Sequence, residues 1–151
     1  MALSGSVTQV VAAPAPALFA LVTDIERLPA WNQIIQSVVD CPETVARDAE
    51  WVVELRAMGN TWHSRSRVLE HDHGCGRFVY RSQTDDGNPS YAVWTWAVED
   101  DAIGAKVTVS WELYPKTFLR RVLMAPMRNR QLRNEVRASI QAAERAAVSP
   151  R

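Results

Sequence analysis

Residues 51–69, with the sequence WVVELRAMGNTWHSRSRVL, contain two alternating runs joined by a glycine-asparagine pair. Trp51, Val53 and Leu55 recur at every second position, a period typical of a strand with one buried face. Gly59-Asn60 is typical of a two-residue hairpin turn, so residues 61–69 are predicted to return as the antiparallel partner. This segment therefore predicts a β-hairpin with a buried face.

The position of this turn predicts which residues face each other across the hairpin. Met58 pairs with Thr61 beside the turn. One face contains the pairs Ala57–Trp62, Leu55–Ser64, Val53–Ser66 and Trp51–Val68, and the other contains Arg56–His63, Glu54–Arg65 and Val52–Arg67. The first face is apolar and aromatic with two serines, whereas the second is largely charged. Because side chains alternate strictly along a strand, we expect the first face to point to the core and Arg67 to face water.

The rest of the chain predicts further strands and a long terminal helix. Strands are expected at residues 3–12, 34–39, 77–83, 91–98 and 106–114. Pro14 and Pro16 are expected to open a short helix, and Asp24 to cap a second that breaks near Pro29. Pro126 is expected to kink the terminal helix or begin its second half. The apolar stripe of that helix consists of Leu132, Val136, Ile140, Ala143 and Ala147.

These elements predict a single α+β domain over residues 1–151, with its core at about 3–147. Six or seven strands joined by short loops form an antiparallel sheet, and only the C-terminal helix is long enough to cover its apolar face. A curved sheet wrapped around one helix, with two short helices after the first strand, leaves a space between them. We expect a ligand to occupy that space.

Composition and charge exclude several classes of function. Seventeen basic residues balance seventeen acidic ones, so no overall field attracts nucleic acid or a membrane. The apolar stretch at 10–22 is not preceded by a basic residue and contains two prolines, which argues against a signal peptide and a transmembrane segment. We therefore expect a cytoplasmic protein that does not bind nucleic acid.

Residues 11–24, VAAPAPALFALVTD, and residues 28–32, LPAWN, resemble the opening of a known family. This is the polyketide cyclase/dehydrase branch of the START-like (SRPBCC) superfamily, which has a helix-grip fold. The resemblance extends over nearly the whole chain, because the strand order and terminal helix agree with it. It implies a hydrophobic ligand, since members include aromatase/cyclases and lipid carriers.

The candidate ligand-binding residues are aromatic, small polar or on the helix stripe. They are Trp31, Trp51, Trp62, Ser64, Ser66, Tyr80, Trp94, Trp96, Trp111, Val136 and Ile140. Six tryptophans in 151 residues fit either a crowded core or an aromatic pocket. Inward hydroxyls fit either a ligand carbonyl or ordered water.

Arg67 and Arg81 are the candidate catalytic residues. The resemblance implies them, because arginines on the corresponding strands of aromatase/cyclases are thought to polarise polyketide carbonyls. The hairpin register instead places Arg67 on the solvent face. His63, His71 and His73 do not form a metal-ligand pattern, so a solvated loop is expected at 71–76, with no metal and no cofactor.

Residues 116–137 contain seven basic side chains and one acidic side chain, Glu135. This basic segment is typical of a solvated helix face, or of docking to an acyl carrier protein or an anionic membrane surface.

The sequence as a whole leaves two candidate functions. One is binding of a hydrophobic, aromatic or polycyclic small molecule, such as a lipid or polyketide. The other is a cyclase or aromatase that folds and cyclises a poly-β-keto chain.

Overall fold

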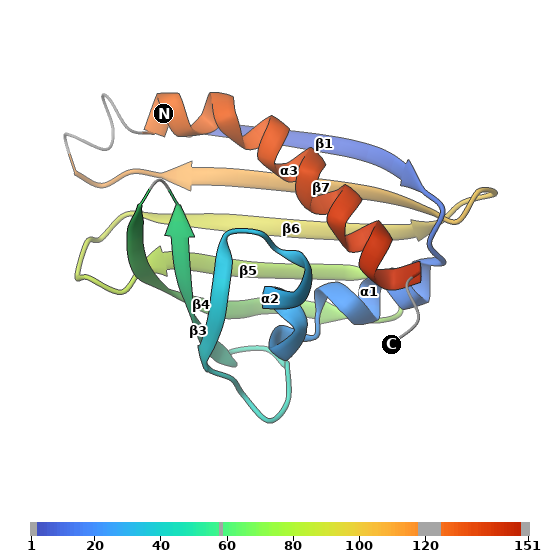
Figure 1. Cartoon of the computed structure of the whole chain (residues 1–151), viewed down its shortest axis with the longest axis horizontal. Coiled ribbons are helices and arrows are strands. Elements are labelled where there is room, and N and C mark those ends of the chain that lie inside the picture. The colour runs from blue at the N-terminus through green and yellow to red at the C-terminus, as the bar shows by residue number, and fades with distance from the viewer. Residues whose placement is uncertain (1–2, 58, 118–124, 149–151) are drawn as a thin grey trace.

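The computed structural model describes residues 3–57, 59–117 and 125–148, and shows a curved sheet crossed by one long helix (Figure 1). The strands are β1 (Leu3–Val11), β2 (Ile35–Asp40), β3 (Glu50–Ala57), β4 (Asn60–Asp72), β5 (Arg77–Thr84), β6 (Tyr91–Asp100) and β7 (Ala105–Tyr114). The helices are α1 (Ala15–Val22), the single 3-10 turn η1 (Ile25–Arg27), α2 (Leu28–Trp31) and α3 (Ala125–Val148).

All seven strands form one antiparallel sheet in the order β1-β7-β6-β5-β4-β3-β2. Successive strands from β2 to β7 are neighbours, as short hairpin connections require. The first strand pairs instead with the last along its whole length, from Leu3 opposite Leu113 to Val11 opposite Ala105. The predicted α+β fold is confirmed, including the curved sheet, the C-terminal helix and the short helices after the first strand.

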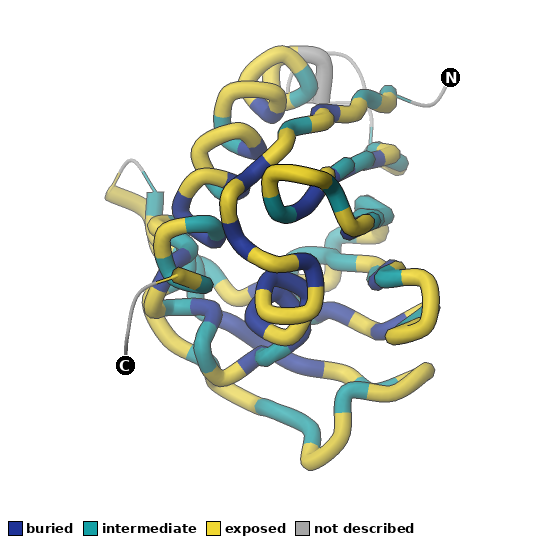
Figure 2. Tube along the Cα trace, turned by 90° about the vertical axis from the view of Figure 1, so that its right-hand side faces the viewer, coloured by how far each residue is buried: buried dark blue, intermediate teal, exposed yellow. Residues whose placement is uncertain are grey.

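Helix α3 crosses the sheet obliquely and packs on β1 and β7, with its C-terminal half next to α1 (Figure 1). Leu132, Val136, Ile140 and Ala143 are buried on it, so the predicted apolar stripe is the face that packs. Figure 2 shows buried positions on the inward sides of the helices and strands, and exposed positions outside. The aromatic side chains Trp51, Phe78 and Trp96 of β3, β5 and β6 lie in the same buried core.

The predicted hairpin register is wrong, because the turn lies one residue earlier in the sequence than expected. Each residue of β3 therefore pairs with a residue of β4 two positions before its predicted partner. Ala57 pairs with Asn60, so the two-residue connection falls at positions 58 and 59, of which Met58 lies outside the described residues. Gly59 has φ +78°, and the second position of such turns favours glycine because it requires a positive φ. The error preserves the face of every side chain, because each pair moves by two residues in total.

The corrected register changes the predicted cross-strand pairs. Trp51 lies opposite Ser66, Val53 opposite Ser64 and Leu55 opposite Trp62, while Glu54 lies opposite His63 rather than Arg65. Thr61 lies opposite Arg56 rather than Met58, which itself lies outside the described residues. The apolar face nevertheless points inward, since Trp51 and Val53 are both buried.

The loop expected at 71–76 is shorter than predicted and covers only residues 73–76, and β4 contains a β-bulge just before it. Val68 pairs with Tyr80, but Glu70 pairs with Val79 and His71 with Phe78, so Leu69 is one residue too many for β5. Strand β4 therefore continues to Asp72, and its alternation reverses after the bulge.

The prolines occupy the starts of helices. Pro14 is the N-cap of α1, with Pro16 in its first turn, as expected. Asp24 precedes η1 without a side-chain capping bond. Pro29 lies in the first turn of α2 rather than ending a helix, because proline costs no hydrogen bond there. Pro126 follows the first residue of α3, so it begins the helix described here.

Candidate functional site

The inner face of the sheet contains a cluster of stacked and tilted rings on β3 and β5. Trp51 stacks on Phe78 with ring centroids 6.0 Å apart and an angle of 18° between the planes. Tyr80 touches both rings, at 5.1 Å from Trp51 and 5.4 Å from Phe78. Strand β4 lies between β3 and β5, and the inward side chain of Trp51 meets those of Phe78 and Tyr80 across it. The three rings are inclined to one another by 18° to 61° and form an aromatic wall of the interior, in which Trp51 is 3% and Phe78 1% exposed.

A second aromatic pair joins α2 to the sheet. Trp31 meets Trp96 edge to face with centroids 6.1 Å apart, and both side chains are buried. The Nε1 of Trp31 is buried and has no hydrogen-bond partner in the described part of the chain. A buried indole N–H without a partner costs about 1–3 kcal/mol in lost hydration.

The hydroxyl end of Tyr80 is enclosed in this interior. Its burial raises the pKa of Tyr80 to about 12, and a side-chain hydrogen bond with Trp96 opposes that rise. Desolvation dominates because the phenolate would lose its hydration. Tyr80 is therefore a neutral hydroxyl at physiological pH.

Serines and half-buried tryptophans complete the inner surface of β4 and β6. Ser64 is buried and donates to the carbonyl of Gln83 at 3.3 Å, whereas Ser66 is buried at 4% exposure. Trp62 and Trp94 are half-buried on the same face. These four predicted site residues thus lie on one wall with Trp51 and Tyr80.

Trp111 lies in the contact of the sheet with α3 and also adjoins Trp94, with ring centroids 6.1 Å apart. It is 1% exposed, and its Nε1 donates to Asn129 Oδ1 of α3 at 2.8 Å. Val136 and Ile140 are likewise buried in the contact of α3 with the sheet. The structure thus places these three predicted residues in the packed core.

His71 was missed as an interior residue because the bulge at Leu69 does not show in the alternation of the sequence. It lies opposite Phe78, with ring centroids 5.6 Å apart, and contacts Phe19 of α1 at 5.7 Å. Its Nδ1 is hydrogen-bonded to the carbonyl of Val45. Its Nε2 is buried and has no partner among the described residues. The Nε2 of His71 is therefore, after the Nε1 of Trp31, a second buried polar atom without a hydrogen-bond partner among the described residues.

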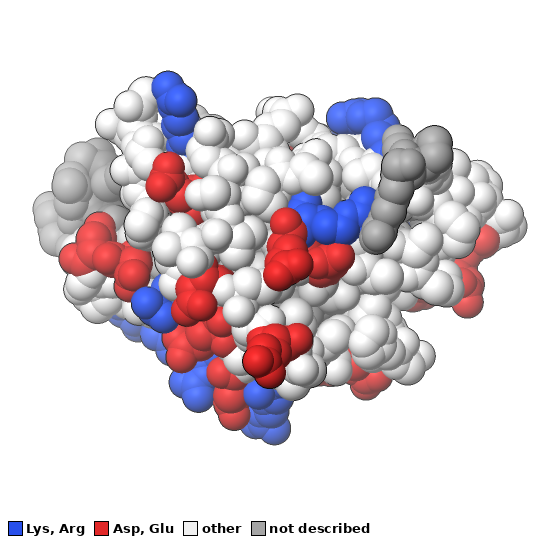
Figure 3. All heavy atoms as spheres, turned by 60° about the horizontal axis from the view of Figure 1, so that its bottom comes forward, with Lys and Arg blue, Asp and Glu red and all other residues white. Residues whose placement is uncertain are grey.

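Both candidate catalytic arginines lie on the outer face of the sheet. Arg67 is exposed and pairs with Asp48 at 3.1 Å. The Arg81 guanidinium lies over the ring of Tyr91, 3.8 Å from its centroid. Neighbouring ion pairs include Arg65 with Asp85 at 3.3 Å. Acidic and basic side chains are correspondingly interspersed on the surface seen in Figure 3.

Two arginines of the basic segment have partners within the chain. Arg128 pairs with Glu135 at 2.6 Å, and Arg133 donates to the carbonyl of Ser6 at 2.9 Å. Arg120 and Arg121 lie outside the described residues. These contacts account for part of the basic segment as intramolecular packing.

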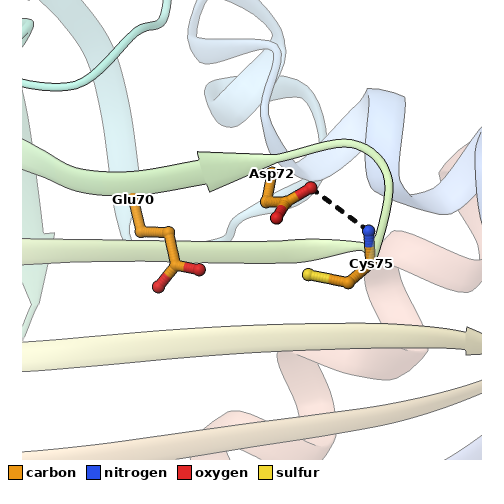
Figure 4. A group of neighbouring side chains, drawn as sticks. All are labelled: Glu70, Asp72 and Cys75. Atoms are coloured by element: carbon orange, nitrogen blue, oxygen red, sulfur yellow. Dashed lines mark hydrogen bonds between the residues drawn. The ribbon is translucent and has the colours of Figure 1, made fainter.

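Glu70 and Asp72 at the end of β4 and Cys75 in the turn that follows form an exposed group, close enough to share an ion (Figure 4). Asp72 accepts from the backbone N–H groups of Gly74 at 2.9 Å and Cys75 at 3.3 Å. A hydrogen bond with the Cys75 side chain, and then these two backbone bonds, lower the pKa of Asp72 because they stabilise its carboxylate form. Glu70 pairs with Arg77 at 3.0 Å. The group is explained by closure of the turn.

A separate hollow of about 260 Å³ lies between α1 and the end of α3. It is lined by Ala17, Ala20, Leu21, Asp24, Arg27, Ala146 and Ala147, none of which is a predicted site residue.

Among the described residues, no helix is long and apolar enough to cross a membrane.

Comparison with known proteins identifies the family. A family model described as polyketide cyclase/dehydrase and lipid transport matches residues 2–147. The chain therefore belongs to this family. A search of curated protein sequences finds no match.

Similar solved structures share the fold at low identity. Ara h 8.0201 is 15% identical, with 99% of this chain and 100% of that chain covered and a TM-score of 0.80. The di-domain aromatase/cyclase StfQ of steffimycin biosynthesis is 13% identical, with 97% and 51% covered and a TM-score of 0.79. Major latex-like protein 151 from Panax ginseng is 11% identical, with 97% and 99% covered and a TM-score of 0.72.

Proposed function

We propose that this protein binds a hydrophobic, aromatic or polycyclic small molecule between the sheet and α3. The observation that carries the proposal is the aromatic wall of Trp51, Phe78 and Tyr80, together with the unpaired Nε1 of Trp31, which packs on Trp96 next to Phe78. A planar ligand would stack on the wall and offer an acceptor to the indole. Membership of a family described as including lipid transport supports the same kind of ligand.

The absence of charge from this face favours an apolar ligand. Over the described positions 51–55, 62–68, 78–82 and 92–98, every inward side chain is apolar, aromatic or hydroxyl-bearing. Burying each ligand carbon in such a site contributes about 25 cal/mol per Å² of apolar surface removed from water. A charged ligand would lose its hydration without gaining an ion pair.

Blocking the interior tests the proposal. The probe is an acetylnaphthol whose hydroxyl and acetyl groups lie at opposite ends of the ring system, and its binding is followed by quenching of tryptophan fluorescence. Ser66→Leu adds bulk at a buried inward position and should weaken binding at least tenfold. Arg67→Leu adds the same side chain at the next position, on the outer face, and should leave affinity unchanged.

Equal loss in the two variants, or no quenching of the wild-type protein, contradicts the proposal. Native mass spectrometry of the purified protein is an independent measurement of the natural ligand. We expect a co-purifying small molecule that is absent from Ser66→Leu and present in Arg67→Leu.

A cyclase or aromatase is the second candidate, favoured by the family description and by the fold shared with StfQ. Cyclisation of a poly-β-keto chain needs a group that polarises a carbonyl or moves a proton. The outward positions of Arg67 and Arg81 do not favour these residues for that role. Incubation with a poly-β-keto thioester and detection of a cyclised product tests this candidate directly.

A further inference from the structure

We infer that His71 and Trp31 are the specificity-determining polar residues of the interior, with His71 accepting a hydrogen bond from a ligand hydroxyl and Trp31 donating one to a ligand carbonyl or ether oxygen. This inference rests on the proposed function. It assigns to the ligand class one donor and one acceptor, which hydrophobicity alone does not specify.

The bulge in β4 directs His71 to the interior. In an unbulged strand, residues 62, 64, 66 and 68 would be followed on the inner face by residue 70. The extra residue Leu69 reverses the order, so Glu70 pairs outside with Arg77 and His71 shares the inner face with Phe78. Bulges that redirect a side chain are frequent beside binding and active sites.

The contact with Val45 fixes the hydrogen-bonding role of His71. A backbone carbonyl only accepts, so the imidazole nitrogen that faces Val45, Nδ1, must hold the proton. In the neutral imidazole Nε2 is then an acceptor, and it is buried without a partner in the described chain. A ligand hydroxyl is the group that satisfies it.

The unpaired donor of Trp31 lies across the same row of rings. His71, Phe78 and Trp96 are direct neighbours on β4, β5 and β6, and Trp31 packs against Trp96. The row spans two strand spacings, or about 10 Å. This is the scale of a fused-ring aromatic molecule, so one ligand with oxygens at opposite ends satisfies both atoms.

The test compares three naphthalene probes by isothermal titration calorimetry. The acetylnaphthol offers both groups, its methyl ether lacks the hydroxyl donor, and the corresponding ethylnaphthol lacks the carbonyl acceptor. The wild-type protein should bind the acetylnaphthol about five- to tenfold more tightly than either analogue, the difference expected for one hydrogen bond. This comparison needs no variant and holds even where a substitution impairs folding.

Two variants assign each bond to its residue. His71→Phe should weaken the acetylnaphthol about five- to tenfold and leave the methyl ether unchanged, and Trp31→Phe should abolish the preference over the ethylnaphthol. His63 is an exposed histidine on the outer face, so His63→Phe is the matched control. It should change neither the preference over the methyl ether nor the preference over the ethylnaphthol. His71→Gln retains an acceptor and should retain part of the hydroxyl preference.

The outcomes separate this inference from the proposed function. Binding of all three probes with equal affinity, still sensitive to Ser66→Leu, overturns the inference and leaves the proposed function standing. An equal loss for hydroxyl and ether probes in His71→Phe also overturns it, because His71 would then act only by packing. Failure of every probe to bind the wild-type protein overturns both.

Discussion

Trp111 lies so close over Gly5 that a β-carbon at Gly5 would be 2.4 Å from its Cζ2. The two residues are direct partners on β7 and β1, and the indole is held from the other side by Asn129 of α3. Glycine at this position therefore lets the sheet and α3 approach around one fully buried ring. The contact fixes the first strand, the last strand and the helix relative to one another.

Gly5→Ala should destabilise the protein by about 1–3 kcal/mol, because the methyl group must displace the indole or the strand. Ser4→Ala, on the exposed face of the same strand, is the matched control and should change stability by less than about 0.5 kcal/mol. Urea unfolding followed by circular dichroism measures both. An unchanged midpoint for Gly5→Ala would show that the strand and ring do not pack this way.

Tyr80 should make stability fall at alkaline pH. Its pKa is about 12 in the folded protein and about 10 when unfolded, so the unfolded chain loses its proton first as pH rises. The raised pKa of Tyr80 therefore contributes at most about 2–3 kcal/mol to the free energy of unfolding. This contribution is fully present below pH ~10 and is lost progressively as the pH rises to ~12.

The measurement is urea unfolding of wild-type protein and Tyr80→Phe from pH 9 to about 12. The variant lacks the ionisable hydroxyl, so its stability should fall less steeply than that of the wild-type protein over this range. Parallel curves would contradict burial of the hydroxyl.

Arg67→Ala should leave the free energy of unfolding almost unchanged. Its partner Asp48 is 65% exposed and Arg67 itself 55%, and exposed ion pairs contribute about 0–1 kcal/mol. The affinity for the acetylnaphthol should also stay unchanged, since the guanidinium faces water. Val68→Ala, the next residue and fully buried, should cost about 2 kcal/mol or more by leaving a cavity. A strong loss of ligand affinity in Arg67→Ala would revive the cyclase candidate.

The fold was predictable because its signals are periodic. Alternation identified the strands, and the spacing of Leu132, Val136 and Ile140 identified the buried face of α3. The face of Arg67 was also predicted from alternation despite the wrong turn. Turn position is set by which residue adopts a positive φ, and the adjacent Gly59 and Asn60 allow two choices that the sequence does not separate.

The interior polar groups were less predictable. His71 points inward because of one extra residue, Leu69, and nothing in the alternation of residues 61–72 marks a bulge there. The assignment of Trp111 to the helix contact depends on Asn129 and Gly5, which are distant in sequence. Such roles depend on tertiary contacts that periodicity does not encode.

The position of a bound probe tests the central claim most directly. Isotope-filtered NMR of the labelled protein with the acetylnaphthol detects which side chains lie within contact distance of its ring protons. We predict cross-peaks to the rings of Trp31, Trp51 and Trp96 on the inner face. Cross-peaks confined to outer-face residues such as Tyr91, or none to any inner-face ring, would contradict a ligand site between the sheet and α3.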